Sequence, residues 1–286
     1  MSRTRDDTSA ALSLPALHDW HLGLAQAFAC VGEPDFPCHL AAALGRLMPI
    51  ESMMISLECK GQPPQLLYQQ GIPDEHRDAI INRYFSRGYL LDPFCLAVES
   101  GLAQGFYHLA EIAPDDFFNS EYYKSYYLKT GSAEDSYYIV DLGDHRKISV
   151  CLYQGLSAGR FTHEQLDLLR AVEPLVRAVI AQFARSGLQR GTLVVDPLAV
   201  AQVPQANLNQ QIQAAFMSFG CDLLTERERE VAHLILRGHS VKSTARVVDI
   251  SPETVRMHRK NLYAKLAIGS QAELFAQFID CLTQGQ

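Results

Sequence analysis

The last quarter of the chain alternates apolar positions at helical spacing with residues that begin or end helices. Thr225 and Glu228 form a capping box, in which each side chain satisfies a backbone N–H of the other. Gly238 can adopt the left-handed conformation that ends the helix following this box. The residues predicted to begin the four helices are Thr225, Ser240, Ser251 and Ser270. The short connection between the second and third helices predicts a helix-turn-helix.

The third of these helices has an apolar face and a cationic face. Between Ser251 and Leu266 the sequence holds four Lys or Arg residues and one acid, Glu253, although the whole chain has a formal net charge of −7. Cations beside phosphates release counterions, and Arg can bind guanine edges in a bidentate manner. Solvation of an ordinary amphipathic surface is the alternative. We favour DNA recognition, with the candidate residues Lys242, Thr254, Arg256, His258, Arg259, Lys260, Asn261 and Lys265.

Upstream of residue 186 the hydrophobic pattern changes repeatedly between the helical and the strand period. Helices are expected at 14–47, 74–86, 93–100 and 117–128, and a long helix runs from Thr162 to about Phe183. Strands are expected at 50–57, 65–69, 105–109, 136–141 and 147–153. This order predicts an α-β-α sandwich, an antiparallel sheet with helices on both faces. The fold class is therefore α+β, with this sandwich preceding an all-α four-helix helix-turn-helix domain.

The length of 286 residues suits two domains. A region rich in Gln, Pro and Ala and poor in charge follows Ser186, so we expect domains at 1–186 and 222–286 with a linker at 187–221. Residues 222–286 contain nine Lys or Arg and eight Asp or Glu, a balance of +1 that leaves −8 for the rest. An acidic N-terminal domain is not expected to hold DNA itself.

Several classes of protein are excluded by composition. No apolar run approaches the ~20 residues that span a bilayer, and the N-terminus leads into no signal-peptide core. The seven cysteines are scattered and form no Cys-x-x-Cys pair, as in reduced cytoplasmic proteins. The ten histidines lack metal-ligand spacing. We therefore expect a cytoplasmic protein without a membrane span, a metal ion or a cofactor.

The C-terminal segment closely resembles the DNA-binding domain of LuxR-type transcriptional regulators. The matching segments are Leu224–Val231, Gly238, Ile250–His258 and Lys265–Leu266. Ser243 and Thr244 depart from the family pattern of an acid followed by a bulky aliphatic residue, so we expect weaker packing of the second helix. One recognition helix contacts few bases, so a homodimer on paired half-sites of a double-stranded DNA operator is expected. The last helix (272–282), with Leu274, Phe275 and Phe278, is the candidate contact between the two DNA-binding domains, and RNA polymerase is a further expected partner.

The run from Arg83 to Phe94 resembles the Tyr…Gly-Tyr…Asp-Pro segment of the autoinducer-binding domain of quorum-sensing LuxR regulators. The resemblance implies that Tyr84 and Asp92 line a small-molecule pocket. The other ligand-binding candidates are Tyr89 and Tyr107. Ile80 stands where the family has the Trp that donates to the lactone, and Ile has no donor. The expected effector is thus a small molecule other than an acyl-homoserine lactone.

Three other functions are compatible with a chain of this size and differ in the sequence features they require. A response regulator needs an acidic pair after an N-terminal strand, and Asp6 and Asp7 follow none. An enzyme is not expected, because the sequence contains no nucleophile elbow, phosphate-binding glycine loop or metal triad. An N-terminal domain that binds a partner protein or only dimerises remains open. The predicted function is a one-component, quorum-sensing-like transcriptional regulator in which a small molecule controls dimeric operator binding.

Overall fold

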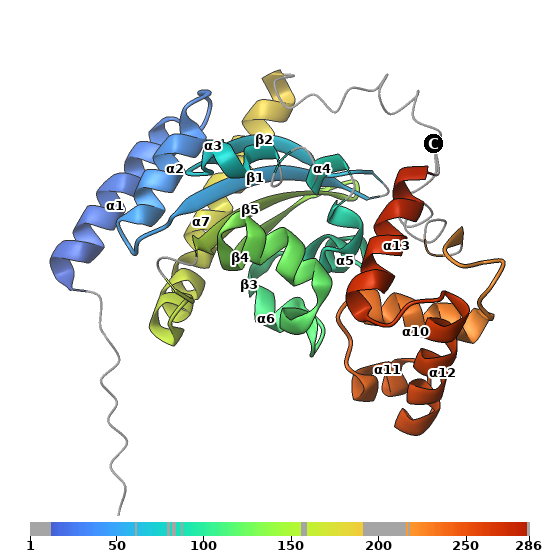
Figure 1. Ribbon diagram of the computed structural model, residues 1–286. Coiled ribbons are helices and arrows are strands. Elements are labelled where there is room, and N and C mark those ends of the chain that lie inside the picture. The colour runs from blue at the N-terminus through green and yellow to red at the C-terminus, as the bar shows by residue number, and fades with distance from the viewer. Residues whose placement is uncertain are drawn as a thin grey trace, which may run out of the picture.

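The computed structural model describes residues 13–284, apart from Gly61, 79–80, 82–83, Arg87, 156–158, 191–215 and Met217. An N-terminal part contains a sheet with helices on both faces, and a C-terminal part contains four helices that lie beside it (Figure 1). The sandwich and the helical domain confirm the predicted fold class. Among the described helices, none is long and apolar enough to span a membrane.

The sheet has five strands in the order β2-β1-β5-β4-β3, and every neighbouring pair is antiparallel. The strands are β1 (Ser52–Cys59), β2 (Gln65–Gln70), β3 (Gly105–His108), β4 (Ser132–Gly143) and β5 (Arg146–Gly155). Asp144 and His145 join β4 to β5 with φ angles of 50° and 59°. Positive φ at both central residues matches the right-handed twist of a hairpin, and Asp and His tolerate it better than most residues. All five strands lie where the sequence predicted strands.

One face of the sheet is covered by three long helices. These are α1 (Leu14–Ala29), α2 (Phe36–Gly45) and α7 (His163–Arg190), which appear in blue and yellow in Figure 1. Because side chains alternate along a strand, Met53, Ile55 and Leu57 of β1 all reach this face and join one apolar core with the helices. Phe36 stacks on Phe183 in the same core, with 4.5 Å between ring centroids. The core therefore fixes the sheet from one side.

Helix α7 continues to Arg190, beyond the end predicted near Ser186. A single glycine such as Gly187 costs only about 1 kcal/mol inside a helix, and tertiary contacts can offset that amount. The Arg190 guanidinium donates to the backbone carbonyl of Gly32, in the turn between α1 and α2. This contact supplies a reason why the last turn of α7 remains helical. The helix therefore ends later than predicted, because a contact with a distant turn cannot be read from the local sequence.

The opposite face is covered by short helical segments. They are α3 (Asp74–Arg77), α4 (Tyr84–Ser86), η2 (Gly88–Leu91), α5 (Pro93–Glu99), α6 (Leu109–Ile112), η3 (Phe117–Asn119), η4 (Tyr123–Tyr127) and η5 (Leu128–Thr130). Every described residue of the helix predicted over 74–86 is helical, with Asp78 and Ile81 in π-helical conformation. The aromatic stretch near 117–128 contains a π-helical turn, η4, which is rare and is often found at functional sites.

The C-terminal helices are α10 (Glu226–Leu236), α11 (Val241–Val247), α12 (Pro252–Lys265) and α13 (Gln271–Gln284). The four predicted caps form as expected: the hydroxyls of Thr225, Ser240, Ser251 and Ser270 each accept from the N–H three residues later. Gly238 has a φ of +88°, as the predicted helix end requires. The Glu273 carboxylate accepts from the N–H of Gly269 instead of completing a capping box with Ser270.

The described end of the predicted linker packs against the helical domain. Phe216 stacks on Phe278 of α13, with 5.0 Å between ring centroids, and Phe219 meets the same ring edge-on. Leu274 and Phe278 are fully buried. These two side chains are therefore occupied within their own domain, whereas Phe275, the third residue of the predicted contact, is half-buried. The contact between two DNA-binding domains stays a prediction.

Candidate nucleic-acid interface and ligand cavity

Helix α12 presents most of the predicted DNA-binding side chains to solvent. Val255 and Leu262 are buried against the other helices, whereas Arg256, Lys260 and Asn261 are exposed on the opposite side. Pro252 stands at the first helical position, where its missing N–H costs no hydrogen bond. The helix is thus anchored on one face and open on the other, as a groove-binding helix must be.

The remaining predicted contacts lie around this open face. Arg256 pairs with Glu253 at 3.0 Å, and both side chains are exposed. The Arg259 guanidinium carbon lies 5.3 Å from the ring centroid of Tyr263, which orients it. Lys242 is exposed on α11, whereas Thr254 and His258 of α12 are half-buried. The hydroxyl oxygen of Thr254 lies 2.9 Å from that of Ser251.

Lys265 differs from the other cations of α12. Its Nζ lies 2.7 Å from Oε2 of Glu228, a carboxylate that is almost completely buried. The same oxygen accepts from the backbone N–H of Thr225 at 2.9 Å, within the capping box of α10. Burial opposes ionisation of Glu228, but the Lys265 ammonium and the Thr225 N–H outweigh it and lower the pKa. The charge of Lys265 is therefore already matched inside the domain.

The two residues of α11 that depart from the family pattern are Ser243, which is half-buried, and Thr244, which is buried. Thr244 is fully buried, and its hydroxyl oxygen has no hydrogen-bond partner within the described part of the chain. Ser243 is tied to His239 by a contact of 2.8 Å between its Oγ and Nδ1. A buried unpaired hydroxyl costs about 1–3 kcal/mol. The unpaired hydroxyl of Thr244 agrees with the expectation of weaker packing in this helix, which stays a prediction.

A cavity of about 310 Å³ lies between the sheet and its cover of short segments. Tyr137 and Tyr153 project from β4 and β5, and Tyr84, Asp92 and Tyr122 close it from the other side. The volume is at the lower end of the range for small-molecule pockets, about 300–1,000 Å³. The cavity therefore has the size and position of a binding site for a compact ligand.

Asp92 is held in the cavity wall by the segment that contains it. Oδ1 accepts from the N–H of Phe94 at 2.8 Å, so Asp92 caps helix α5. Oδ2 accepts from the hydroxyl of Tyr84 at 2.5 Å. Burial raises the pKa of Asp92, although these two hydrogen bonds act in the other direction. Tyr84 and Asp92 thus meet at the cavity, as the sequence suggested.

Sequence reasoning missed a second carboxyl group, Asp135 of β4. Its Oδ2 accepts from the hydroxyls of Tyr127 and Tyr137, both of which line the cavity. Its Oδ1 has no partner within the described residues, and the side chain is 1% exposed. Burial raises the pKa of Asp135 to about 8. The alternation of β4 could have placed Asp135 and Tyr137 on one face, but not under a cavity.

The other predicted ligand residues do not line this cavity. Tyr89 is buried in an apolar cluster next to it. Tyr107 borders a separate shallow hollow near Arg170, and its hydroxyl donates to the carbonyl of Ala103 at 3.0 Å. Ile80, on which the argument against a homoserine lactone depends, falls outside the described residues. The structure therefore brings together two of the four predicted ligand residues.

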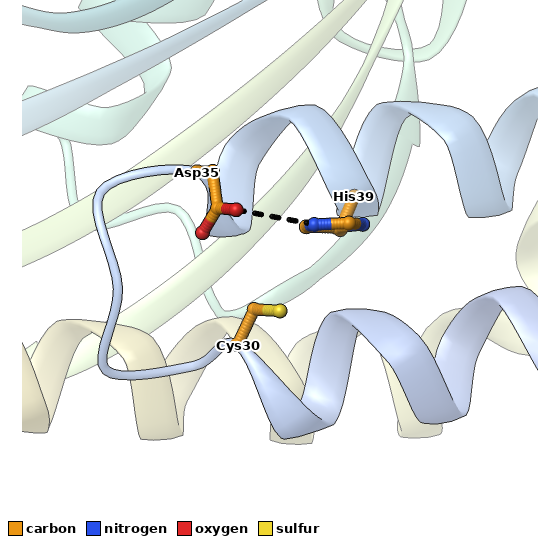
Figure 2. A group of neighbouring side chains, drawn as sticks. All are labelled: Cys30, Asp35 and His39. Atoms are coloured by element: carbon orange, nitrogen blue, oxygen red, sulfur yellow. Dashed lines mark hydrogen bonds and ion pairs between the residues drawn. The ribbon is translucent and has the colours of Figure 1, made fainter.

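One group of side chains has the chemistry of metal ligands. Cys30, Asp35 and His39 place one ligand atom each within 4.8 Å of one another in the turn between α1 and α2 (Figure 2). Nε2 of His39 lies 3.3 Å from Oδ2 of Asp35, the spacing of an ordinary ion pair one helical turn apart. Thiol, carboxylate and imidazole are zinc ligands. This group lies on the helical layer across the sheet from the cavity, so it contributes nothing to ligand binding there.

The two domains are in direct contact, which the sequence did not predict. The Asp115 carboxylate accepts from the backbone N–H of Ser240 at 2.9 Å and from its hydroxyl at 2.6 Å. The N–H of Asp116 donates to the carbonyl of Gly238 at 3.0 Å. A Cβ atom at Gly238 would lie 2.7 Å from Cα of Phe117, so only glycine allows this approach. The turn before α11 is thereby attached to the loop after α6.

A cavity-bearing α-β-α domain attached to a helix-turn-helix domain defines a class of DNA-binding regulators. Residues 222–277 match the family described as "Bacterial regulatory proteins, luxR family". A protein of Aeromonas salmonicida, described as an HTH-type transcriptional regulator, is 34% identical over 191 residues, which are 67% of this chain and 94% of that protein. The chain therefore belongs to the LuxR family of bacterial regulatory proteins, a family of transcriptional regulators and not of enzymes.

Two further similarities cover the separate domains. UhpA of Escherichia coli K12, a transcriptional regulatory protein, is 42% identical over 59 residues, which are 21% of this chain and 30% of UhpA. The VqsR LBD domain from Pseudomonas aeruginosa has a TM-score of 0.51 and 28% identity, and the match covers 58% of this chain and 97% of that domain. The predicted resemblance is confirmed for both domains.

Proposed function

We propose that this chain is a one-component regulator whose N-terminal domain senses a small molecule and thereby controls operator binding by a dimer. The cavity at Tyr84 and Asp92 is the observation that carries the sensing half of the proposal. The similarity to a structure named as an LBD domain supports the same interpretation. Its domains would be 1–186 and 222–286, with a linker between them, and the protein would act in the cytoplasm together with RNA polymerase.

DNA recognition is assigned to the open face of α12. Five of the predicted residues are exposed: Arg256, Lys260, Asn261 and Lys265 on α12, and Lys242 on the neighbouring α11. Lys265 is paired with Glu228, so the other three cations can reach phosphates or base edges. Dimerisation is supported by apolar side chains that remain exposed on long helices: Phe28 of α1 and Leu175 of α7 are 60% and 50% exposed. Such residues gain free energy when a second copy covers them.

The DNA assignment is tested with a site selected in vitro from random DNA. We expect Arg256→Ala/Lys260→Ala to bind this site at least tenfold more weakly than the wild type, and to lose about one to two units of the salt slope. Lys129→Ala/Arg185→Ala removes two exposed cations of the N-terminal domain and serves as the matched control. Equal affinity and equal salt slope for the two double variants would contradict the assignment.

The sensing assignment is tested by filling the cavity. Ser132 lines it, and Ser132→Phe should exclude the small molecule that native mass spectrometry detects on protein purified from its own host. Ser100→Phe places the same ring on an exposed site as a control. We expect the mass of the bound molecule to be lost in the first variant only. Two results together would instead favour a domain that binds a partner protein or only dimerises. The wild type would carry no small molecule, and the wild type and Ser132→Phe would bind the operator with equal affinity.

A further inference from the structure

The cavity wall is acidic. The carboxylates of Glu51 and Asp92 line it, and the carboxyl group of Asp135 lies directly behind the hydroxyls of Tyr127 and Tyr137. Among the described lining residues, His76 is the only basic side chain, and none is Lys or Arg. Buried carboxylates are costly unless a cation or hydrogen-bond donors compensate them. Asp92 accepts hydrogen bonds from Tyr84 and Phe94, but no Lys or Arg among the described lining residues balances its charge, and a positively charged ligand would do so.

The rest of the wall is aromatic. Six tyrosines line the cavity: Tyr84, Tyr122, Tyr126, Tyr127, Tyr137 and Tyr153. The faces of such rings carry partial negative charge and attract ammonium groups, and several rings around one cation form the cage that recognises amines. The rings also provide flat apolar surfaces for the body of a ligand. A cationic head and a flat apolar body therefore both find matching surfaces.

Two hydroxyl groups in the wall lack partners. The hydroxyls of Tyr122 and Ser132 are buried and have no hydrogen-bond partner within the described part of the chain, and Oδ1 of Asp135 shares this condition just behind the wall. All three oxygens can accept hydrogen bonds. Leaving such a group unpaired costs about 1–3 kcal/mol, which a ligand with several N–H donors would recover. An ammonium group has three donors.

Two glycines lie against side chains of the cavity wall, the carboxylate of Glu51 and the ring of Tyr126. A Cβ atom at Gly155 would lie 1.8 Å from Oε2 of Glu51, so a larger residue would displace this carboxylate. A Cβ atom at Gly88 would lie 2.6 Å from the ring of Tyr126. The positions of one carboxylate and one ring of the wall thus depend on residues that lack side chains.

We propose that the cavity binds a primary amine in its cationic form, attached to a compact aromatic or otherwise flat apolar body. The ammonium group is held by Asp92 and by the surrounding tyrosine faces, and Glu51 adds negative charge to the same wall. This inference rests on the proposed sensing function. It also predicts that a neutral lactone binds weakly, because a lactone brings no positive charge to the Asp92 carboxylate.

The test uses three probes of nearly equal shape: phenylpropylamine, phenylpropanol and phenylpropionate. Binding to the full-length protein is measured by isothermal titration calorimetry and by the shift in melting temperature. We expect the amine to bind at least tenfold more tightly than the alcohol, and the carboxylate not to bind. In Asp92→Asn the preference for the amine should fall to less than threefold. Asn retains an oxygen that can cap α5, so this variant is expected to fold.

The control is Asp167→Asn, the same change at a carboxylate on α7 that is 77% exposed. It should keep the full preference for the amine. The proposal is overturned if the alcohol or the carboxylate binds as tightly as the amine, if the preference persists in Asp92→Asn, or if none of the probes binds at millimolar concentration. Failure of the sensing function would look different: the amine would bind with the expected preference but leave operator affinity unchanged.

Discussion

Replacing Lys265 by Gln tests whether this lysine stabilises the C-terminal domain, in contrast to the cations of α12 that are proposed to bind DNA. Lys265 Nζ lies 2.7 Å from Oε2 of Glu228, whose side chain is 4% exposed, whereas the Lys265 side chain is 39% exposed. A hydrogen bond to a charged group contributes about 1.5–3 kcal/mol. The exposed lysine and the remaining hydrogen bond from Thr225 reduce the loss. We therefore expect the free energy of unfolding of this domain to fall by about 1–2 kcal/mol.

Such a loss corresponds to a decrease of roughly 5–10 °C in the melting temperature of a domain of this size. Lys260→Gln is the matched control, because Lys260 is exposed on the same helix. Exposed substitutions of this kind change stability by no more than about 0.5 kcal/mol. The effects on DNA should be reversed: Lys260→Gln should lower the salt slope by about one unit, and Lys265→Gln should leave it unchanged.

The pH dependence provides a further check on Lys265→Gln. The pKa of Glu228 is lowered in the folded protein, so its ionised form stabilises the fold above the unfolded value, near 4.3. This contribution disappears as the pH falls through the lowered folded value. The difference in melting temperature between wild type and variant should therefore be full at pH 7 and shrink below about pH 4. A variant that melts like the wild type at pH 7 but loses operator affinity would refute the structural role of Lys265.

Three further predictions concern other parts of the structure. Asp115→Ala removes both hydrogen bonds to Ser240 and so frees the helix-turn-helix from the N-terminal domain. Because an exposed charged contact contributes ~0.5–1 kcal/mol, operator affinity should rise by about two- to fivefold. An operator affinity that is unchanged in a fluorescence anisotropy titration would contradict this. Gly238→Ala forces a methyl group against Phe117 at a φ of +88°, so denaturant unfolding should show a loss of about 1–3 kcal/mol. Between about pH 4 and 8 the folded state keeps a proton on Asp135 that the unfolded state has lost, so wild-type stability should decline as the pH rises. Thermal melts of Asp135→Asn should show a smaller decline, because the pKa of Asp92 is also raised by burial.

The C-terminal domain was predicted almost completely because its signals are local. The caps at Thr225, Ser240 and Ser251 depend on residues three positions away, and each forms in the structure. The role of Lys265 was not predicted, because its partner, Glu228, is 37 residues distant. Sequence periodicity assigned this lysine to the outer face of α12, but it cannot show whether an outward cation meets solvent or a buried carboxylate.

The cavity was predicted only in part for a similar reason. Tyr84 and Asp92 belong to one short run, and a motif can identify them together. Asp135 comes from a strand on the other side of the cavity, and only the register of β4 against β5 and the π-helical turn η4 bring it under Tyr127. Asp115 and Ser240 are 125 residues apart in the sequence, so no local hydrophobic or capping pattern indicates their contact. Long-range partners of this kind are decided by tertiary packing.

The acidic cavity links ligand binding to the stability of the N-terminal domain. Burial raises the pKa values of Asp92 and Asp135, which means that folding disfavours their ionised forms. A bound cation would reverse this effect, and a ligand that binds only the folded state increases the free energy of unfolding by about 2.7 kcal/mol at one hundred times its dissociation constant.

Operator affinity can respond to the ligand only if the ligand binds two arrangements of the domains with different affinities. The loop that carries Asp115 follows α6 and leads into Tyr122 of the cavity wall, so ligand contacts and the interdomain contact share one segment of chain. Ordering this segment around an amine is therefore the simplest physical route from the cavity to the helix-turn-helix.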